Sequence, residues 1–450
     1  MGFSPKQILA IALTSLLSGT AAADKAETKG GLKITSDDGN FSASLGGRIH
    51  FDTYLFDTDI EDPISTTEFR RARITLKGDI YSWRYILEQD FAAGDTNSGF
   101  RDVYLAREFL NGEVRIGQFK PFRSMAEMTS SNEITFMERP FSSATGLYDG
   151  RQFQQGIGWT GGMDCVTLGM MAFNLRDTGT RRNEGVGAAS RLAWAPINTD
   201  YKTLHFGTSI SFENANQNSP DLLAEADYAG RRGPEQLVAL TPGDLGGHAS
   251  TFGLELAGSY GPLYLQAEYF IGDFEGDYYL SELDYEDEFG APAPFPCDPE
   301  FGCYISNQTV HTWYVQGSWM LTGEHKTYNS KRGAFNSAKY TGSGLWEGSW
   351  ELTARYDFME NRSYDFLEAQ STIIGLNYYA NHNVRFMLNM SFGDDDFTDR
   401  DDHREPDVPG DLPRLRGAPQ GRLRCADART AQKTQPLHQA AFLRERSRTD

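Results

Sequence analysis

Basic side chains recur at alternate positions in the first strand-like stretches of this chain. Alternate residues of an extended strand point to opposite faces, and the apolar residues of these stretches occupy one parity. The other parity carries six bases, which are Arg48, Arg71, Arg73, Lys77, Arg84 and Arg115. Two unit charges about 4 Å apart at an effective dielectric of about 20 interact by about 4 kcal/mol, so such a wall around a narrow bore favours anions. Asp52, Glu88, Asp90 and Asp102 share this face, and neutral wall pairs are the alternative.

One base breaks the pattern. Arg70 falls on the apolar parity of its stretch, where an Arg facing lipid would cost about 2–4 kcal/mol at the middle of a bilayer. We therefore expect Arg70 to lie at a rim or at a β-bulge, or to extend to the lipid headgroups.

A segment without alternation follows these stretches. Residues 120–139 are rich in small hydroxyls and in charges of both signs, which predicts a loop over about 120–145 that folds into the lumen and sets the bore. The hydroxyls of Ser130 and Ser131 could replace part of the hydration shell of an oxyanion.

The elements that carry these residues are strands of a membrane barrel. In residues 346–358 one parity holds Trp, Trp, Leu, Ala, Tyr and Phe, while the other is polar. Apolar residues that end in aromatics are typical of strands with lipid outside and water inside. Alternation predicts fifteen strands, near 41–56, 67–79, 80–91, 99–109, 111–119, 151–161, 163–176, 187–196, 202–213, 249–260, 261–271, 307–322, 346–359, 369–381 and 382–393.

Composition and the connections agree with an all-β transmembrane antiparallel barrel. The chain is 39% hydrophobic, and no apolar run after the first tens of residues reaches the roughly 18 that a membrane helix needs. Short turns such as Gly261–Pro262 are expected on the periplasmic side, and the long segments near 214–247, 272–306 and 323–345 on the extracellular side. The segment Asp273–Glu288 holds eight acids and no base; it is either a solvated loop or a contact with lipopolysaccharide bridged by divalent cations.

The N-terminus predicts export, and the C-terminus differs from the final strand expected of a barrel. Residues 1–23 read as a signal peptide, with a basic start, an apolar stretch and a small-residue cleavage site. The barrel is expected over 24–398. Residues 399–450 are Arg- and Pro-rich without alternation, which indicates either a shifted reading frame that has lost the closing strand or a disordered basic tail. In the oxidising compartment, Cys297 and Cys303 are the expected disulfide, and Cys165 is expected to be unpaired.

Several motifs in order resemble the phosphate-selective porin O and P family. They include Leu45-Gly46-Gly47-Arg48, Phe69-Arg70-Arg71-Ala72-Arg73, Thr129-Ser130-Ser131 and Arg355-Tyr356-Asp357. The resemblance implies a sixteen-stranded trimeric barrel in the Gram-negative outer membrane, with an inward constriction loop that passes phosphate or polyphosphate. Positions matching those that line the anion zone of the family are Arg48, Arg70, Arg71, Arg84, Asp102, Ser130, Ser131 and Arg139.

Glu127 departs from this resemblance. The phosphate-selective members place a Lys ahead of the Thr-Ser-Ser, and a carboxylate there would repel a dianion. A broader anion pore is then an equal alternative, and a Lys at position 127 would be expected to strengthen phosphate binding. Lys120 or Arg123 could compensate for the carboxylate.

Two other classes of protein remain to be weighed. An outer-membrane enzyme would need a nucleophile motif such as Gly-x-Ser-x-Gly or a cluster of metal ligands, and the sequence shows neither. A structural or adhesive barrel would have its lumen blocked by paired charges. The sequence calls for no cofactor and no nucleic acid, and it predicts inorganic anions, membrane lipid and copies of itself as partners.

Overall fold

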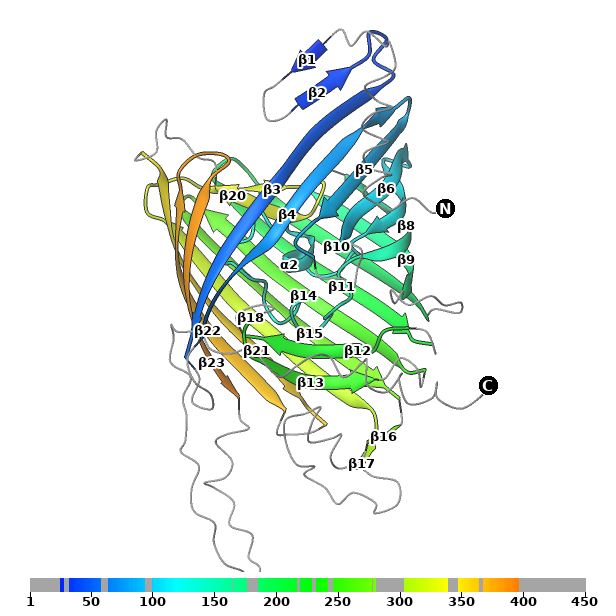
Figure 1. Ribbon diagram of the computed structural model, residues 1–450, viewed down its shortest axis with the longest axis vertical. Coiled ribbons are helices and arrows are strands. Elements are labelled where there is room, and N and C mark those ends of the chain that lie inside the picture. The colour runs from blue at the N-terminus through cyan, green and yellow to red at the C-terminus, as the bar shows by residue number, and fades with distance from the viewer. Residues whose placement is uncertain are drawn as a thin grey trace, which may run out of the picture.

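The fold is a curled antiparallel sheet. The computed structural model describes residues 25–27, 32–57, 64–93, 99–163, 165–175, 185–216, 219–228, 232–241, 246–276, 278–280, 303–338, 347–363 and 367–395. The main sheet has 17 strands, and it curls around an interior occupied by loops (Figure 1).

The long strands follow one another in chain order, each hydrogen-bonded to the next. Their bounds are β3 (Ser42–Phe56), β4 (Ile64–Ile80), β5 (Trp83–Asp90), β6 (Phe100–Phe109), β7 (Gly112–Phe119), β8 (Gln154–Met163), β9 (Val166–Leu175), β10 (Gly185–Asn198), β11 (Lys202–Asn214), β14 (His248–Tyr260), β15 (Leu263–Glu275), β18 (Gln308–Met320), β21 (Ser349–Asn361), β22 (Glu368–Tyr379) and β23 (Arg385–Asp395).

Shorter elements lie in the connections and at the N-terminal edge. They are β1 (Lys25–Glu27) with β2 (Leu32–Thr35), β12 (Leu222–Asp227) with β13 (Glu235–Thr241), β16 (Tyr278–Leu280) with β17 (Cys303–Ile305), β19 (Lys326–Asn329) with β20 (Ala334–Ala338), and the single helical turn α2 (Met125–Met128).

The alternating stretches of the sequence are confirmed as strands, all fifteen of them within the described residues. The apolar parity is the outer one, since Ile49 is 73% exposed and Leu388 69%. Aromatic pairs such as Trp350 with Tyr378 lie near the strand ends, with ring centroids 4.5 Å apart. This arrangement is typical of a sheet whose outer face meets lipid.

The first and last long strands run parallel to each other. Neighbouring strands are antiparallel throughout, so the first and fifteenth members of the series point the same way. An antiparallel barrel therefore closes between β3 and β23 only through one further strand, which agrees with an expected total of sixteen. Within the described part of the chain, β23 pairs only with β22, and β3 pairs with β4 and the short β2.

One connection lies at the opposite end from the prediction. The segment between β18 and β21 was expected to be extracellular, but strand direction places it at the same end as the short turn at Gly261. Its hairpin β19–β20 turns back into the barrel, where Ser330 and Gly333 accept hydrogen bonds from Thr167 and Arg191 on the wall. Segment length alone misassigned this end, because a long connection that refolds into the lumen needs no extracellular space.

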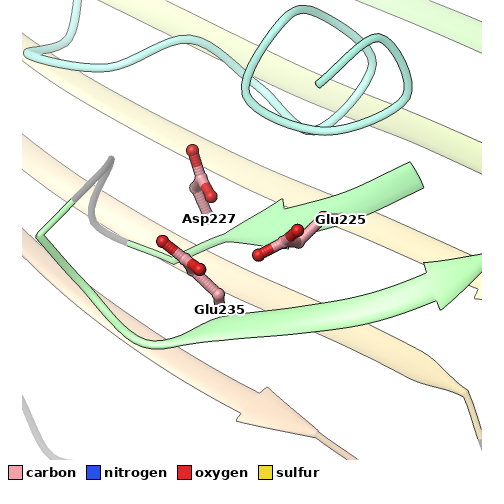
Figure 2. A group of neighbouring side chains, drawn as sticks. All are labelled: Glu225, Asp227 and Glu235. Carbon is pink, nitrogen blue, oxygen red and sulfur yellow. The ribbon is translucent and has the colours of Figure 1, made fainter. Parts of the chain in front are cut away.

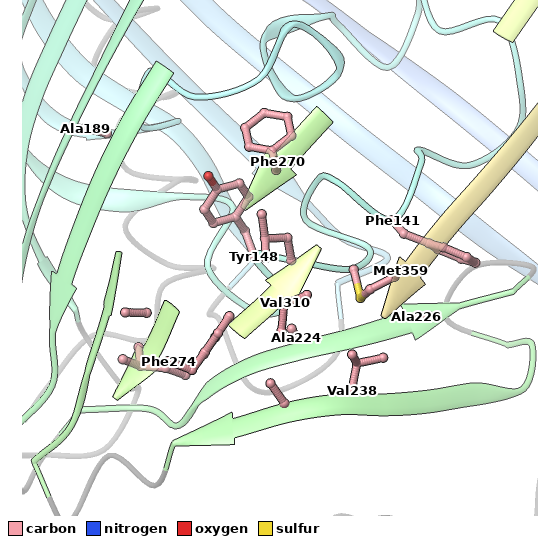
Figure 3. Packing of buried hydrophobic residues seen from close by; sticks show 14 of the residues in the cluster. Phe141, Tyr148, Ala189, Ala224, Ala226, Val238, Phe270, Phe274, Val310 and Met359 are labelled. Carbon is pink, nitrogen blue, oxygen red and sulfur yellow. The ribbon is translucent and has the colours of Figure 1, made fainter. Parts of the chain in front are cut away.

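Part of the interior is packed with apolar side chains, although the sequence predicted water inside the barrel. The hairpin β12–β13 and residues 141–148 pack against the inner faces of the wall, as Figure 3 shows for Tyr148, Phe270, Val310 and Met359. Tyr148, Phe270 and Val310 are at most 1% exposed. This packing fills part of the lumen with protein.

Some predictions lie outside the described residues. They are the signal peptide 1–23, the tail 399–450 and Cys297. Cys303 is disulfide-bonded and buried in β17, while Cys165 is a free, exposed cysteine. Among the described residues, no helix has the length and apolarity to cross a membrane.

Candidate functional site

The connection between β7 and β8 forms a constriction loop inside the barrel. Residues 120–153 leave the wall after Phe119, make the turn of α2 and lie inside the curled sheet (Figure 1). The Ser124 hydroxyl caps α2 by accepting the backbone N–H of Glu127 at 2.9 Å. The structure has this inward segment over 120–153 rather than 120–145, and its role in setting the bore stays a prediction.

Ser130 and Ser131 face the first strand of the wall. The Nη1 atom of Arg48 donates to Ser131 Oγ at 2.9 Å and lies 3.5 Å from Ser130 Oγ. Its Nη2 atom pairs with Glu88 Oε2 at 3.0 Å. Because these hydroxyl oxygens accept from Arg48, their hydrogens remain able to donate to a third group.

Arg70 lies at a β-bulge, which confirms one of the placements expected from its parity. His50 pairs with Arg71 and Phe51 with Phe69, so Arg70 is the extra residue of β4 and its side chain turns inward. Its Nη2 atom donates to Glu138 Oε2 of the constriction loop at 2.9 Å, and its Nε atom contacts Glu138 Oε1.

Arg71 is a buried cation with no carboxylate within 4 Å among the described residues. Its side chain is 5% exposed, and its Nη1 atom lies 3.3 Å from His50 Nδ1. Arg71 can only donate, so His50 Nδ1 accepts and its Nε2–H donates to Asn132 Oδ1 at 3.3 Å. The imidazole is thereby held in one neutral tautomer.

Among the other predicted bases, Arg48, Arg73, Arg84 and Arg115 pair with carboxylates, as the alternative of neutral wall pairs supposed. Lys77 is exposed and has no ion pair within 4 Å among the described residues. Arg73 contacts Glu88 and Asp90 at 2.9 and 2.8 Å. Arg84 and Arg115 share Glu113 at 2.5 and 2.8 Å. Asp102 lies on the same wall strand as Tyr104 and close to the charge of Glu88. Carboxylates therefore neutralise four of the six predicted bases, whereas Arg71 has no such partner within 4 Å among the described residues.

Glu127 does not project a free charge into the bore. It is 2% exposed, and its Oε1 atom lies 3.0 Å from Lys120 Nζ. Burial opposes its ionisation, but the charges of Lys120 and Arg139 outweigh burial and lower the pKa of Glu127 to about 2. Lys120 thus supplies the compensation considered from sequence, whereas Arg123 pairs with Glu213 instead.

Arg139 and Arg385 are two further cations without a described carboxylate within 4 Å. Arg139 donates to the backbone oxygens of Ala126 and Thr129, and Arg385 Nη1 donates to Ile134 O at 2.9 Å. Sequence reasoning missed Arg385, although it holds the inward parity of β23 beside the exposed Phe386. Assigning faces to the last strands as well as the first would have found it.

A group of carboxylates occupies the hairpin β12–β13. Oxygens of Glu225, Asp227 and Glu235 all lie within 4.8 Å of one another, and Figure 2 shows the three side chains converging. Burial, followed by the hydrogen bond and charge of Glu235, raises the pKa of Glu225 to about 10. Burial and the charge of Asp149 raise the pKa of Asp227 as well. This group therefore carries less negative charge at neutral pH than three acids would suggest.

Comparison with known proteins identifies the family of the chain. The profile of phosphate-selective porin O and P matches residues 44–417. Porin O of Pseudomonas aeruginosa is 25% identical over 433 residues, which covers 86% of this chain and 91% of that protein.

Solved porins are also similar at low identity. An anion-selective porin from Comamonas acidovorans is 12% identical with a TM-score of 0.46, covering 79% of this chain and 89% of that one. The outer membrane channel DcaP of Acinetobacter baumannii is 12% identical with a TM-score of 0.44, covering 80% and 92%. The family match over most of the chain decides the assignment: this chain belongs to the phosphate-selective porin O and P family and is an outer-membrane porin.

Proposed function

We propose that the channel conducts anions by passive diffusion and binds phosphate or polyphosphate beside Arg71. The observation that carries this proposal is the buried guanidinium of Arg71, which has no carboxylate within 4 Å among the described residues. An isolated buried charge is costly in a protein, and a passing anion would offset that cost. Among the other predicted bases on the wall of β3–β7, only the exposed Lys77 also lacks an ion pair within the described residues.

The groups around Arg71 suit an oxyanion. Arg48 supplies a second guanidinium, and the hydroxyls of Ser130 and Ser131 supply donors within its reach. Arg139 and Arg385 add positive charge on the loop and on β23 without described ion pairs. Together these groups can replace water around the oxygens of phosphate while leaving the anion free to move on.

The remaining predicted residues have supporting roles in this proposal. Arg70, Arg73, Arg84 and Arg115, with Asp102 and Glu127, fix the charge balance of the wall and the loop. Because Lys120 neutralises Glu127, the carboxylate does not count against phosphate. We further propose a homotrimer whose outer faces contact membrane lipid and lipopolysaccharide, and a channel rather than an enzyme.

Planar-bilayer recording of the full chain tests the proposal. The reversal potential in a potassium chloride gradient should show preference for chloride over potassium. Adding phosphate at constant ionic strength should reduce the chloride current in a saturable manner, and nitrate should reduce it much less. Preference for potassium, or a chloride current that phosphate leaves unchanged, would refute the proposal.

A further inference from the structure

The Trp-Glu-Leu-Thr-Ala-Arg-Tyr-Asp stretch of β21 has an inward face that anion binding alone does not explain. Glu351, Arg355 and Asp357 point inward and are at most 4% exposed, although a lumen residue that contacts ions should reach water. Each instead faces the protein: Glu351 lies 2.9 Å from Lys326 and Asp357 lies 2.5 Å from Arg355.

Arg355 donates hydrogen bonds to the backbone of the constriction loop. Its Nη1 atom donates to Glu138 O at 2.9 Å and its Nη2 atom to Arg139 O at 3.2 Å. Its guanidinium also lies over the ring of Phe136, 4.7 Å from the centroid. Asp357 Oδ2 lies 2.5 Å from Arg355 Nε on the same strand, which places a negative charge beside the guanidinium.

Packing alone does not hold the loop at this point. A small cavity of about 20 Å³ lies between the loop, the wall and the hairpin β19–β20, and Phe136, Glu138, Arg139, Gln316, Lys326 and Arg355 contribute to its lining. Beside this cavity, directional polar contacts add to packing in positioning the loop. Arg355 supplies two of these contacts to consecutive residues of the loop.

The two residues whose backbone oxygens accept from Arg355 also contact residues next to the proposed anion site. The Glu138 side chain pairs with Arg70 at the bulge of β4, next to Arg71. Arg139 reaches back to Thr129 O, just before Ser130. A shift of the Glu138 and Arg139 carbonyls would therefore move the hydroxyls and release Glu138 towards Arg71, where it would neutralise the open cation.

We propose that Arg355 is a positioning residue that sets the constriction loop against the wall of β3 and β4 and so keeps Arg71 available to anions. This inference rests on the proposed function for its readout in current, but the position of the loop can be measured separately. Arg355 does not itself need to touch an anion in this role.

The test replaces Arg355 with Lys, which keeps the charge and loses the two-pronged fork, and with Gln, which loses the charge but can still donate. Arg191→Lys is the matched control. Arg191 is also 4% exposed, pairs with Glu255 and donates to two backbone oxygens, but those belong to Arg332 and Gly333 of the other inward hairpin. Heat-modifiable migration on a gel establishes folding of each variant.

Two measurements are made on the full chain. Spin labels at N132C in the loop and E108C at the rim, in a background with C165S and C425S, report the distance distribution between loop and wall. Phosphate block of chloride current reports the anion site. Arg355→Lys and Arg355→Gln should broaden the distribution and weaken the block by about tenfold, as expected for loss of two charge-assisted hydrogen bonds, whereas Arg191→Lys should do neither.

The outcomes separate the two proposals. An unchanged distance distribution in both Arg355 variants, full block restored by the charge of Lys, or equal effects of Arg191→Lys would overturn the positioning role. Failure of both Arg355 variants to fold while Arg191→Lys folds would also overturn it, as a role in stability alone. If phosphate does not block the unmodified channel, the proposed function fails, and the distance measurement still decides the role of Arg355.

Discussion

Among the described residues, Arg71 is the one buried cation of the β3–β7 wall that has no carboxylate within 4 Å. Replacing Arg71 with Gln removes this charge. An anion about 4 Å from the guanidinium gains about 4 kcal/mol at an effective dielectric of about 20 and about 1 kcal/mol in bulk water. A partly wet bore lies between these limits, so we take about 2 kcal/mol for a monovalent anion, or about 30-fold in affinity. A divalent phosphate should lose roughly the square of this factor.

The assay is the concentration of phosphate that halves the chloride current in a planar bilayer. Arg84→Gln is the matched control, because Arg84 also lies on the inward parity but pairs with Glu113 at 2.5 Å and has a side chain 52% exposed. Surface pairs of this kind contribute about 0–1 kcal/mol, so the control should change the block by less than about fivefold.

Thermal stability is a second measurement, and it should change in the opposite direction to the phosphate block. An unpaired buried charge destabilises a fold, so Arg71→Gln should raise the temperature at which the heat-modifiable form is lost, even as it weakens the block. The reasoning is refuted if Arg71→Gln and Arg84→Gln weaken the block equally, or if Arg71→Gln lowers both the block and the thermal stability.

Three further perturbations address the loop and the hairpins. Glu127→Gln should make the stability of the fold less sensitive to acid. The pKa of Glu127 is lowered in the folded protein, so its carboxylate stabilises the fold at pH values above the pKa of the unfolded chain, and this stabilisation is lost as the pH falls towards about 2. The free energies of unfolding of the two proteins should therefore converge between about pH 5 and about pH 2. Anion preference should fall as pH rises towards about 10, where Glu225 ionises. In Glu225→Gln the reversal potential should depend less on pH than in the unmodified channel. An equal dependence on pH in the two proteins would contradict the assignment. Gly333→Ala should destabilise β19–β20 by about 1–3 kcal/mol, because Gly333 has a φ of +60° and its Cβ would lie 2.7 Å from Ala193 Cβ. Thermal unfolding should show a smaller loss for Gly39→Ala, because Gly39 has a similar φ of +70° but its added Cβ meets nothing within 4 Å.

The strands, and the face on which each side chain lies, could be predicted from residue order alone. Period-two alternation is a local property, since each residue's side of the sheet follows from its neighbours in the chain. Ile49 could therefore be placed in lipid and Arg48 in the lumen without coordinates. The same rule flagged Arg70 as an exception, and the bulge between Arg71 and Phe69 resolved it.

Ion pairing was decided only by the tertiary structure. Arg71 and Arg73 look equivalent in sequence, both basic and both inward. Arg73 meets Glu88 and Asp90 from the neighbouring strand β5, whereas Arg71 meets the neutral His50 of β3. The difference depends on cross-strand register, which a bulge shifts by one residue.

The contents of the lumen also required the folded chain. Alternation says that a side chain points inward but not what it meets there, so the apolar packing around Tyr148 and the inward hairpin that carries Gly333 had no local signature. Glu127 shows the consequence: it reads as a repulsive charge in sequence, and Lys120 neutralises it at 3.0 Å in space. Local periodicity fixes the wall of the barrel because it depends on neighbours in the chain, whereas contacts between distant segments decide which charges of that wall remain open to an anion.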